Sequence, residues 1–463
     1  MMKQTTLLNK KNLLAILSIG VIITSCTKLI EIPENPKNQL VAGRVFSDST
    51  NIIAAVSGVY SNFAIASSYP QFASGLITIN TGLAADELVV GPNAFGATEF
   101  YNNAVAPDNS TIRSMWSDAY KNIFQINLCI EGITGTTAIS AKLKAQLISE
   151  LKVDRALYYY HMINLWGAVP IVTSTDYKIT QKAGRSSVSE VLSFILSDLT
   201  DAQQGLTTDY PSSGRKRPNL YVAQALLSKV YLYMGQYENA FTSASSVIAS
   251  PLYQLEPLST VFLSGSKEAI WQLPANGTYQ QTPEGAAFIP FSSDYQPDYT
   301  LSPQLLSAFE PNDPRLGTWT GINTVDGTDY YYPYKYKNNS ADQTPLEDYM
   351  ILRLADIYLV RAEAFAQLDK FAEALADLNK IRDRAEDRTD ISTTVKTDLI
   401  KAILHERQVE LFCEWGNRWI DLKRTKTIDA VLSAAKPSWK SNAALFPIPI
   451  NELQANPNLY PNP

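Results

Sequence analysis

Only a few clusters in this 463-residue chain have residue types and spacing suited to catalysis or metal binding. His405 and Glu406 begin like a zinc-protease motif, in which two histidines four residues apart on a helix share one metal ion. The position four after His405 is Val409, so the second ligand is missing. The chain has only 2 histidines, which are isolated, and it has no EF-hand-like carboxylate loop. The sequence therefore predicts no metal site.

Paired carboxylates are the next candidates. Glu406 and Glu410 share a helix face and could be read as a general acid and base, but glycosidases set their two carboxylates across a cleft, about 5 to 9.5 Å apart. A structural ion-pair network is favoured instead, because buried charges are kept when they are paired. Its expected members are Arg407, Arg418, Arg424, Glu410, Glu414 and Asp421. Asp86 and Glu87 are adjacent and point in different directions, so we expect them to support the fold.

Other catalytic signatures are missing from the sequence. It contains no nucleophile elbow, P-loop or dinucleotide fingerprint, which predicts a chain without a cofactor and without enzymatic activity. His161 lies in an apolar aromatic run and is expected in the core. A net charge of -6 and a pI near 5.2 give no general basis for binding nucleic acid.

Aromatic residues make binding the better-supported activity, since the chain has 25 Tyr and 7 Trp. Sugars present flat apolar faces rimmed by hydroxyls, so a sugar site needs aromatic platforms beside amides or carboxylates. Two irregular stretches offer this combination, residues 88–110 and residues 251–344. The candidate ligand-binding residues are Asn93, Phe95, Tyr101, Tyr279, Asp294, Tyr295, Tyr299 and Trp319. Packing or partner contact is the alternative for each aromatic, and we expect most of Tyr330, Tyr332, Tyr334 and Tyr336 to be packed.

Paired helices must position these loops. Residues 349–384 predict two helices joined by a tight turn, because apolar residues recur at steps of three and four. The same design occurs earlier, where Gly235, Tyr237 and Ala240 align with Asp369, Phe371 and Ala374. This pattern resembles the turn of a tetratricopeptide repeat. Such units bury their apolar faces only by stacking, which predicts a mostly α, tetratricopeptide-like helical repeat scaffold.

The predicted order along the chain is a single domain over residues 49–463. Helical repeats occupy about 49–250 and 345–430, with helices at residues 49–67, 116–133, 141–166, 188–206, 219–249 and 397–414. Between the repeats, about 251–344 shifts to Pro, Gly, Tyr and Asn, which predicts an irregular inserted subdomain. The tail, 431–463, is expected to end mostly extended because of its prolines.

The first 25 residues are predicted to be a targeting segment. A basic start precedes the apolar run 13–23, and the run leads into Ile23-Thr24-Ser25-Cys26, which looks like a bacterial lipobox. Cleavage before Cys26 would leave acyl chains on this residue and a polar tether over residues 26–48. An ordinary secretory peptide is the alternative. Cys129 and Cys413 are expected to be buried free thiols, with one bridge between them left open.

Several motifs together resemble the SusD/RagB family of outer-membrane nutrient-binding lipoproteins. The resemblance covers essentially the whole chain. Only the last residues, Tyr460-Pro461-Asn462-Pro463, depart modestly from the family pattern. The resemblance is carried by Cys26, Asp86-Glu87, DRALYYYHMINLWGAVPIV at 154–172, Asn312-Asp313-Pro314-Arg315, ERQVELFCEWGNRWIDLKR at 406–424, Phe446-Pro447-Ile448-Pro449 and Asn456-Pro457.

The resemblance implies a lipid-anchored protein on the outer membrane, facing the cell exterior. It also implies a lid-like role over a SusC-like TonB-dependent transporter that imports oligosaccharides or peptides. The predicted function is therefore the capture of an oligosaccharide and its delivery to that transporter. Peptide capture by a RagB-like subunit, an extracytoplasmic glycoside hydrolase and a structural adaptor that binds only protein are the alternatives.

Overall fold

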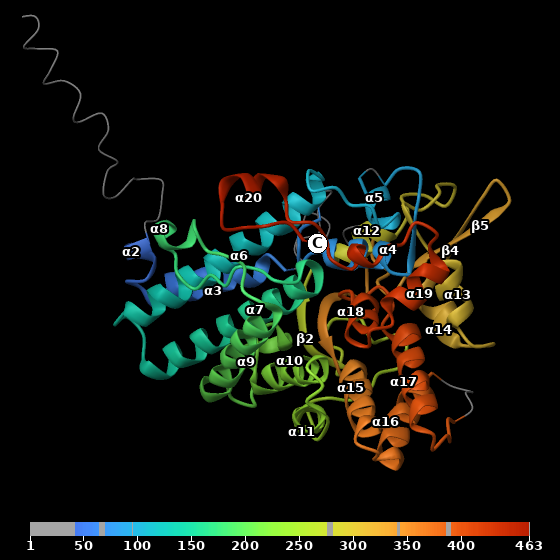
Figure 1. The fold of residues 1–463 in the computed structure, drawn as a ribbon. Coiled ribbons are helices and arrows are strands. Elements are labelled where there is room, and N and C mark those ends of the chain that lie inside the picture. The colour runs from blue at the N-terminus through green and yellow to red at the C-terminus, as the bar shows by residue number, and fades with distance from the viewer. Residues whose placement is uncertain are drawn as a thin grey trace, which may run out of the picture.

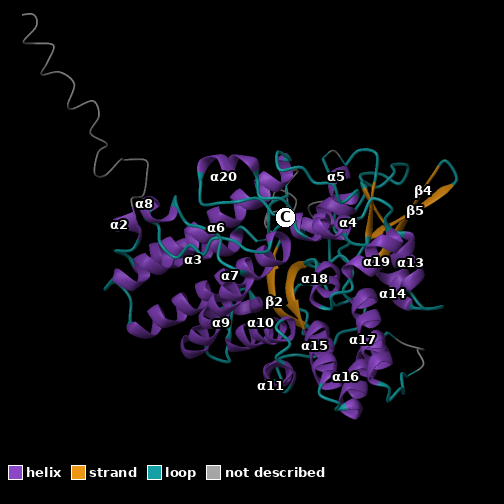
Figure 2. Cartoon of the chain, in the orientation of Figure 1, coloured by secondary structure: helices purple, strands orange, loops and turns teal. Residues whose placement is uncertain are grey.

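The protein is described by a computed structural model over residues 42–63, 70–94, 96–275, 281–339, 343–385 and 390–462. Helices dominate these residues, and the strands form three separate antiparallel pairs (Figure 1, Figure 2). The predicted mostly α fold is confirmed. None of the described helices is both long and apolar enough to cross a bilayer. The predicted lipid attachment residue, Cys26, lies outside the described residues.

The N-terminal half is built on long helices. Their bounds are α2 (Ala42–Val45), α3 (Ser49–Ser61), α4 (Leu76–Ala84), α5 (Thr98–Tyr101), α6 (Ser110–Gly135), α7 (Ala141–Trp166), α8 (Tyr177–Thr180) and α9 (Val188–Gly205), with a 3-10 turn η1 (Ser213–Arg215) after them. Helix α7 packs against both α6 and α9, and its second half is buried on every side. His161 lies in that half, buried as expected, with its ring 5.3 Å from Trp415.

Both predicted helical hairpins are present. They are α10 (Leu220–Tyr233) with α11 (Tyr237–Ile248), and α15 (Leu354–Gln367) with α16 (Phe371–Arg384). The aligned turn residues Gly235 and Asp369 have φ of 70° and 60°, so both turns use the same left-handed position. The hairpins stack through Phe241 and Phe365, whose ring centroids are 5.1 Å apart. Helix α17 (Lys396–Glu410) then packs on α15 and α16.

One prediction for the second hairpin is wrong. Residues 349–353 are not helical but belong to β6 (Asp348–Arg353), which pairs with β2 (Ala269–Pro274). Every residue of β6 is buried, so its apolar run does not reveal a strand period. The β2–β6 pair ties the inserted region to the hairpin that follows it.

The inserted region is less irregular than its composition suggested. It contains β3 (Tyr299–Leu301), β4 (Thr320–Val325) and β5 (Thr328–Pro333), together with α12 (Pro283–Phe288), α13 (Pro303–Ala308) and α14 (Pro314–Trp319). Each of these helices begins with Pro directly after a capping Thr, Ser or Asp. The β4–β5 hairpin projects at one end of the molecule (Figure 2).

The C-terminal part contains α18 (Asn417–Arg424), α19 (Ile428–Ala435), the 3-10 turn η2 (Ser441–Ala444) and α20 (Ile450–Ala455). Helix α20 interrupts a tail that was expected to be mostly extended. Arg185 holds the end of the tail, because its guanidinium donates to the Tyr460 carbonyl at 2.8 Å and lies 4.6 Å from the Tyr460 ring. Cys129 and Cys413 are both buried free thiols.

Candidate functional site

The two stretches predicted to bind ligand are joined by a short sheet. Strand β1 (Leu88–Val90) pairs with β3, and Val90 lies opposite Tyr299. The pairing continues past β1, where the Gly91 N–H donates to the Asp298 carbonyl at 2.7 Å. The loop after β1 is therefore fixed beside the inserted segment, although the two are about two hundred residues apart in the sequence.

A cavity of about 620 Å³ lies where this segment meets α12. Phe291 is 95 % exposed at its edge, which is unusual for a large apolar side chain in a folded protein. Tyr295 is half-buried and contributes a second aromatic ring. The remaining lining residues are Gln281, Gly285, Ala286, Ala287, Phe288, Ile289, Pro290, Asp298 and Asn339. Aromatic faces thus lie beside amides and one carboxylate.

Hydrogen bonds fix the position of Tyr295. Its hydroxyl donates to the Asp298 carboxylate at 3.2 Å. The Asn323 side chain, on β4, donates to the carbonyls of Ser292 and Tyr295 at 2.8 and 2.9 Å. Burial and then the negative charge of Asp298 raise the pKa of Tyr295, while Asn93 opposes the shift. The phenol therefore keeps the proton that it donates to Asp298.

The structure brings three of the predicted ligand residues to this place. Asn93 and Asp294 are exposed near the half-buried Tyr295. Tyr299 packs against Phe288, which lines the cavity, with the two rings edge-on at 6.0 Å, and burial raises the pKa of Tyr299 to about 12. Tyr299 thus supports the cavity wall more than its opening.

The other predicted residues do not join this cluster. Tyr101 lies on α5, with its ring 5.0 Å from the Lys436 ammonium. Phe95 and Tyr279 lie outside the described residues. Phe291 was not among the predicted residues. The signal that could have found it is a single phenylalanine between Pro290 and Ser292-Ser293, because a large apolar residue in a polar turn has no obvious core to enter.

Trp319 was predicted at the ligand site, but the structure places it in the core. Its side chain is 1 % exposed, and the indole N–H donates to the Leu258 carbonyl at 2.9 Å. Two cations lie over the ring: the Lys335 ammonium is 4.8 Å and the Arg353 guanidinium is 5.8 Å from its centroid. Trp319 presents no surface to a ligand, because it covers the cations of a buried charge network.

The carboxylates considered for catalysis belong to that network. Glu410 accepts from Arg315, Arg353 and Arg384, and Glu406 pairs with Arg315 at 2.6 Å. Both glutamate side chains are fully buried. The predicted ion-pair network is present, and Arg407 and Arg424 both pair with Asp421, as expected. Other partners were not predicted: Arg407 also pairs with Asp356, Arg424 with Glu363, and Arg418 with Asp86.

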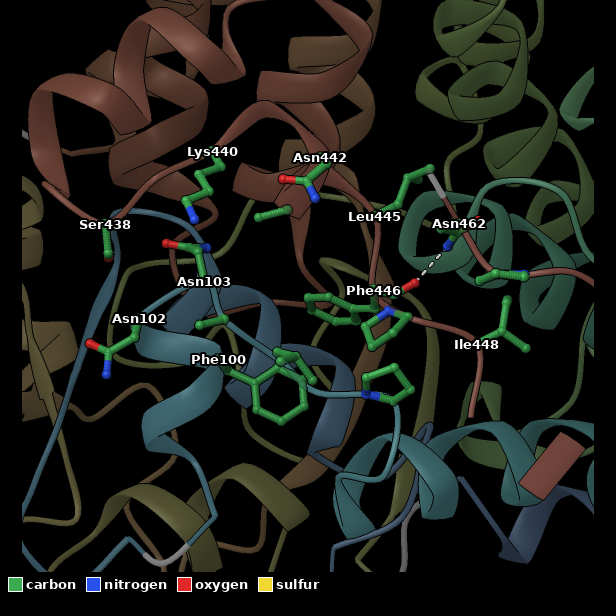
Figure 3. A pocket seen from close by; sticks show the side chains of 16 residues that line it. Phe100, Asn102, Asn103, Ser438, Lys440, Asn442, Leu445, Phe446, Ile448 and Asn462 are labelled. Atoms are coloured by element: carbon green, nitrogen blue, oxygen red, sulfur yellow. Dashed lines mark hydrogen bonds between the residues drawn. The ribbon is translucent and has the colours of Figure 1, made fainter. Parts of the chain in front are cut away.

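A second cavity, of about 780 Å³, lies between the end of α5 with the loop after it and the C-terminal tail (Figure 3). Its aromatic side chains, Phe100 and Phe446, are buried against each other with centroids 5.2 Å apart. Asn462 closes one side by donating to the Phe446 carbonyl. Prolines and aliphatic side chains supply the remaining apolar wall, so no aromatic face is free to stack on a sugar here.

Comparisons with known proteins agree with this architecture. A family model described as "Starch-binding associating with outer membrane" matches residues 78–232, and one described as "SusD family" matches residues 307–463. The chain belongs to the SusD family. A SusD-like protein of Formosa agariphila is 26 % identical, and the alignment covers 95 % of this chain and 96 % of the relative.

Solved structures of SusD-like proteins share the fold. A laminarin-binding SusD-like protein superposes with a TM-score of 0.73 at 22 % identity, covering 90 % of this chain and 99 % of the other. Surface glycan-binding protein A from Bacteroides thetaiotaomicron gives a TM-score of 0.74 at 20 % identity, with coverage of 90 % and 99 %. The resemblance found in the sequence is therefore confirmed for the family and its fold.

Proposed function

We propose that this SusD-family protein binds an oligosaccharide at the cavity beside α12. The observation that supports this most is the exposed ring of Phe291 next to the half-buried Tyr295. Stacking of a sugar face on an aromatic ring contributes about 0.5 to 1.5 kcal/mol. The carboxylate of Asp298 and the amides of Asn93 and Asn339 are within the same region to accept and donate hydrogen bonds.

Similar proteins support this assignment. One solved SusD-like neighbour is described as laminarin-binding and another as a surface glycan-binding protein. Binding without catalysis agrees with the full burial of Glu406 and Glu410, which leaves neither carboxylate open to a substrate. We therefore favour a binding subunit over a glycoside hydrolase.

The proposed role in the cell is capture and delivery. We propose that Cys26 carries the lipid that holds the protein on the outer membrane, facing the exterior. A SusC-like TonB-dependent transporter would receive the bound oligosaccharide. The lipobox at Cys26 and the family model described as associating with the outer membrane support the anchor and its location. The transporter partnership follows from the resemblance to the SusD/RagB family.

The binding proposal is tested by titrating the purified protein with laminarin and with starch in a calorimeter or an affinity gel. Phe291→Ala and Tyr295→Ala should each weaken binding by about tenfold, which corresponds to the loss of one stacking contact. Phe124→Ala on α6 is the matched control, because Phe124 is also exposed and lies away from the cavity. If Phe291→Ala and Tyr295→Ala bind the glycan as tightly as Phe124→Ala does, the ligand binds elsewhere on the protein.

Three further measurements test the alternatives and the proposed partnership. Titration with peptides in place of glycans would identify peptide capture if only peptides bind. Reducing ends released from the same glycans would identify a hydrolase, and their release should be abolished by one carboxylate substitution. Co-purification of the lipidated protein with an outer-membrane barrel tests the transporter partnership.

A further inference from the structure

Helix α8 exposes two apolar side chains in a single turn. Tyr177 is 66 % exposed and Ile179 is 65 % exposed. Lys178 lies between them and Lys182 follows, both exposed as well. Elsewhere in the described part of the chain, large exposed apolar side chains come singly from separate segments. These are Ile53, Phe124, Phe291, Ile322, Leu346, Val395 and Tyr460.

The last turns of α6 connect α8 to the place where the described chain begins. The Thr136 hydroxyl, at the end of α6, donates to the Phe46 carbonyl just after α2. Glu131, one turn earlier, accepts from the Thr175 N–H at 2.9 Å, two residues before α8. Figure 1 shows α8 beside α2 at one end of the molecule. The exposed pair therefore lies next to the place where the described chain begins.

The tether limits how far this end can move from a membrane. Residues 27–41 separate the proposed lipid on Cys26 from the start of α2. An extended chain spans about 3.3 to 3.6 Å per residue, so the domain is kept within roughly 50 Å of the bilayer. This step rests on the proposed lipid anchor.

We propose that α8 is a membrane-contact element, with Tyr177 and Ile179 resting in the headgroup region of the membrane that carries the anchor. Tyrosine favours this region because its ring is apolar and its hydroxyl is polar. Lys178 and Lys182 suit the anionic groups of lipid headgroups. Two apolar side chains bind a bilayer weakly by themselves, but the anchor makes the contact intramolecular and raises their effective concentration. The contact would set the orientation of the domain above the membrane.

A fluorescent label beside α8 tests this. The lipidated full-length protein would be reconstituted into vesicles of phosphatidylethanolamine and phosphatidylglycerol. Gln181→Cys places an exposed thiol directly after α8, and the native Cys129 and Cys413 are buried and should not react. A polarity-sensitive dye at this position should shift to the blue and be quenched several-fold more strongly by spin-labelled lipids than the same dye on Ile322→Cys. Position 322 lies on the β4–β5 hairpin, at the other end of the molecule (Figure 1).

Two substitutions in the labelled background provide the decisive comparison. Tyr177→Ser with Ile179→Ser should remove the blue shift and the extra quenching, while laminarin binding stays unchanged. Equal quenching at positions 181 and 322 in protein that floats with the vesicles would overturn the contact and leave the anchor intact. Protein that does not float would overturn the anchor and the contact together. The glycan titration is independent of both results.

Discussion

The backbone N–H of Gly91 donates a 2.7 Å hydrogen bond to the carbonyl oxygen of Asp298. A Cβ atom on Gly91 would lie 2.3 Å from the carbonyl oxygen of Pro297, so any larger residue would push the two backbones apart. The backbones approach closely because residue 91 has no side chain. This contact holds the loop that carries Asn93 beside the segment that carries Tyr295.

Gly91→Ala should therefore open the candidate site. We expect the loss of the 91–298 hydrogen bond, a free energy of unfolding lower by about 1 to 3 kcal/mol, and weaker laminarin binding. Chemical denaturation and calorimetric titration measure the two effects. Gly58→Ala is the control, because Gly58 is exposed on α3 and an added Cβ meets nothing within 4 Å. If Gly91→Ala behaves like Gly58→Ala, the close approach does not hold the site together.

Asn323 should act on binding through Tyr295. Asn323→Ala removes the donor shared by the carbonyls of Ser292 and Tyr295, which lets the turn move. We expect affinity for the glycan to fall, and we expect a smaller additional loss when Asn323→Ala is combined with Tyr295→Ala. Residues that act through one another give such non-additive effects. Fully additive losses in a double-mutant cycle would show that Asn323 acts independently of Tyr295.

The helical hairpins could be predicted from the sequence because each turn carries a local signal. Gly235 and Asp369 occupy equivalent left-handed positions, and the apolar spacing around them is that of a helix. Strand β6 could not be predicted in the same way. It is buried on both faces, so its sequence has no alternation, and its partner β2 lies more than seventy residues earlier.

The candidate site could be predicted as two stretches but not as individual residues. Composition identified the loop after β1 and the inserted segment, and the β1–β3 pair then joins them. Whether an aromatic residue is exposed depends on long-range packing. Trp319 is buried because Lys335, Arg353 and Arg384 gather around its ring, and these residues come from separate elements. Phe291 stays exposed because no such partner reaches it.

Removing one member of the buried charge network should cost far more stability than breaking an ion pair on the surface. Arg353→Ala removes a cation that pairs with Glu268, Glu410 and Glu414 in the core. Breaking a buried pair in this way costs about 3 to 5 kcal/mol, because the remaining charge loses its partner without regaining water. Lys152→Ala breaks a surface pair with Asp201 and should cost less than about 1 kcal/mol. Urea denaturation of the two variants should therefore give clearly different midpoints, and similar midpoints would contradict this account.

Glu284 should make the protein less stable as the pH rises. It lies buried on α12 and accepts hydrogen bonds from Thr78 and Tyr349. Burial raises its pKa from 4.5 to about 8, with nearby Glu414 adding to the shift and Lys335 opposing it. Between these two values the folded protein keeps a proton that the unfolded chain has released. The contribution of Glu284 to the free energy of unfolding is therefore fully present below about pH 4.5 and is lost as the pH rises towards 8.

Glu284→Gln isolates this contribution, because the amide resembles the protonated acid and does not titrate. Two other buried groups also titrate in this range. Burial raises the pKa of Glu87 to about 7, so Glu87 likewise makes the protein less stable as the pH rises. Burial lowers the pKa of His161 from 6.5 to about 3, so His161 has the opposite effect and makes the protein more stable as the pH rises towards 6.5. Both groups are present in the variant, so they cancel in the comparison. The difference in unfolding free energy between variant and wild type should grow by a few kcal/mol from pH 5 to 8, on the order expected for such a shift. A constant difference over that range would mean that Glu284 is already ionised in the folded protein.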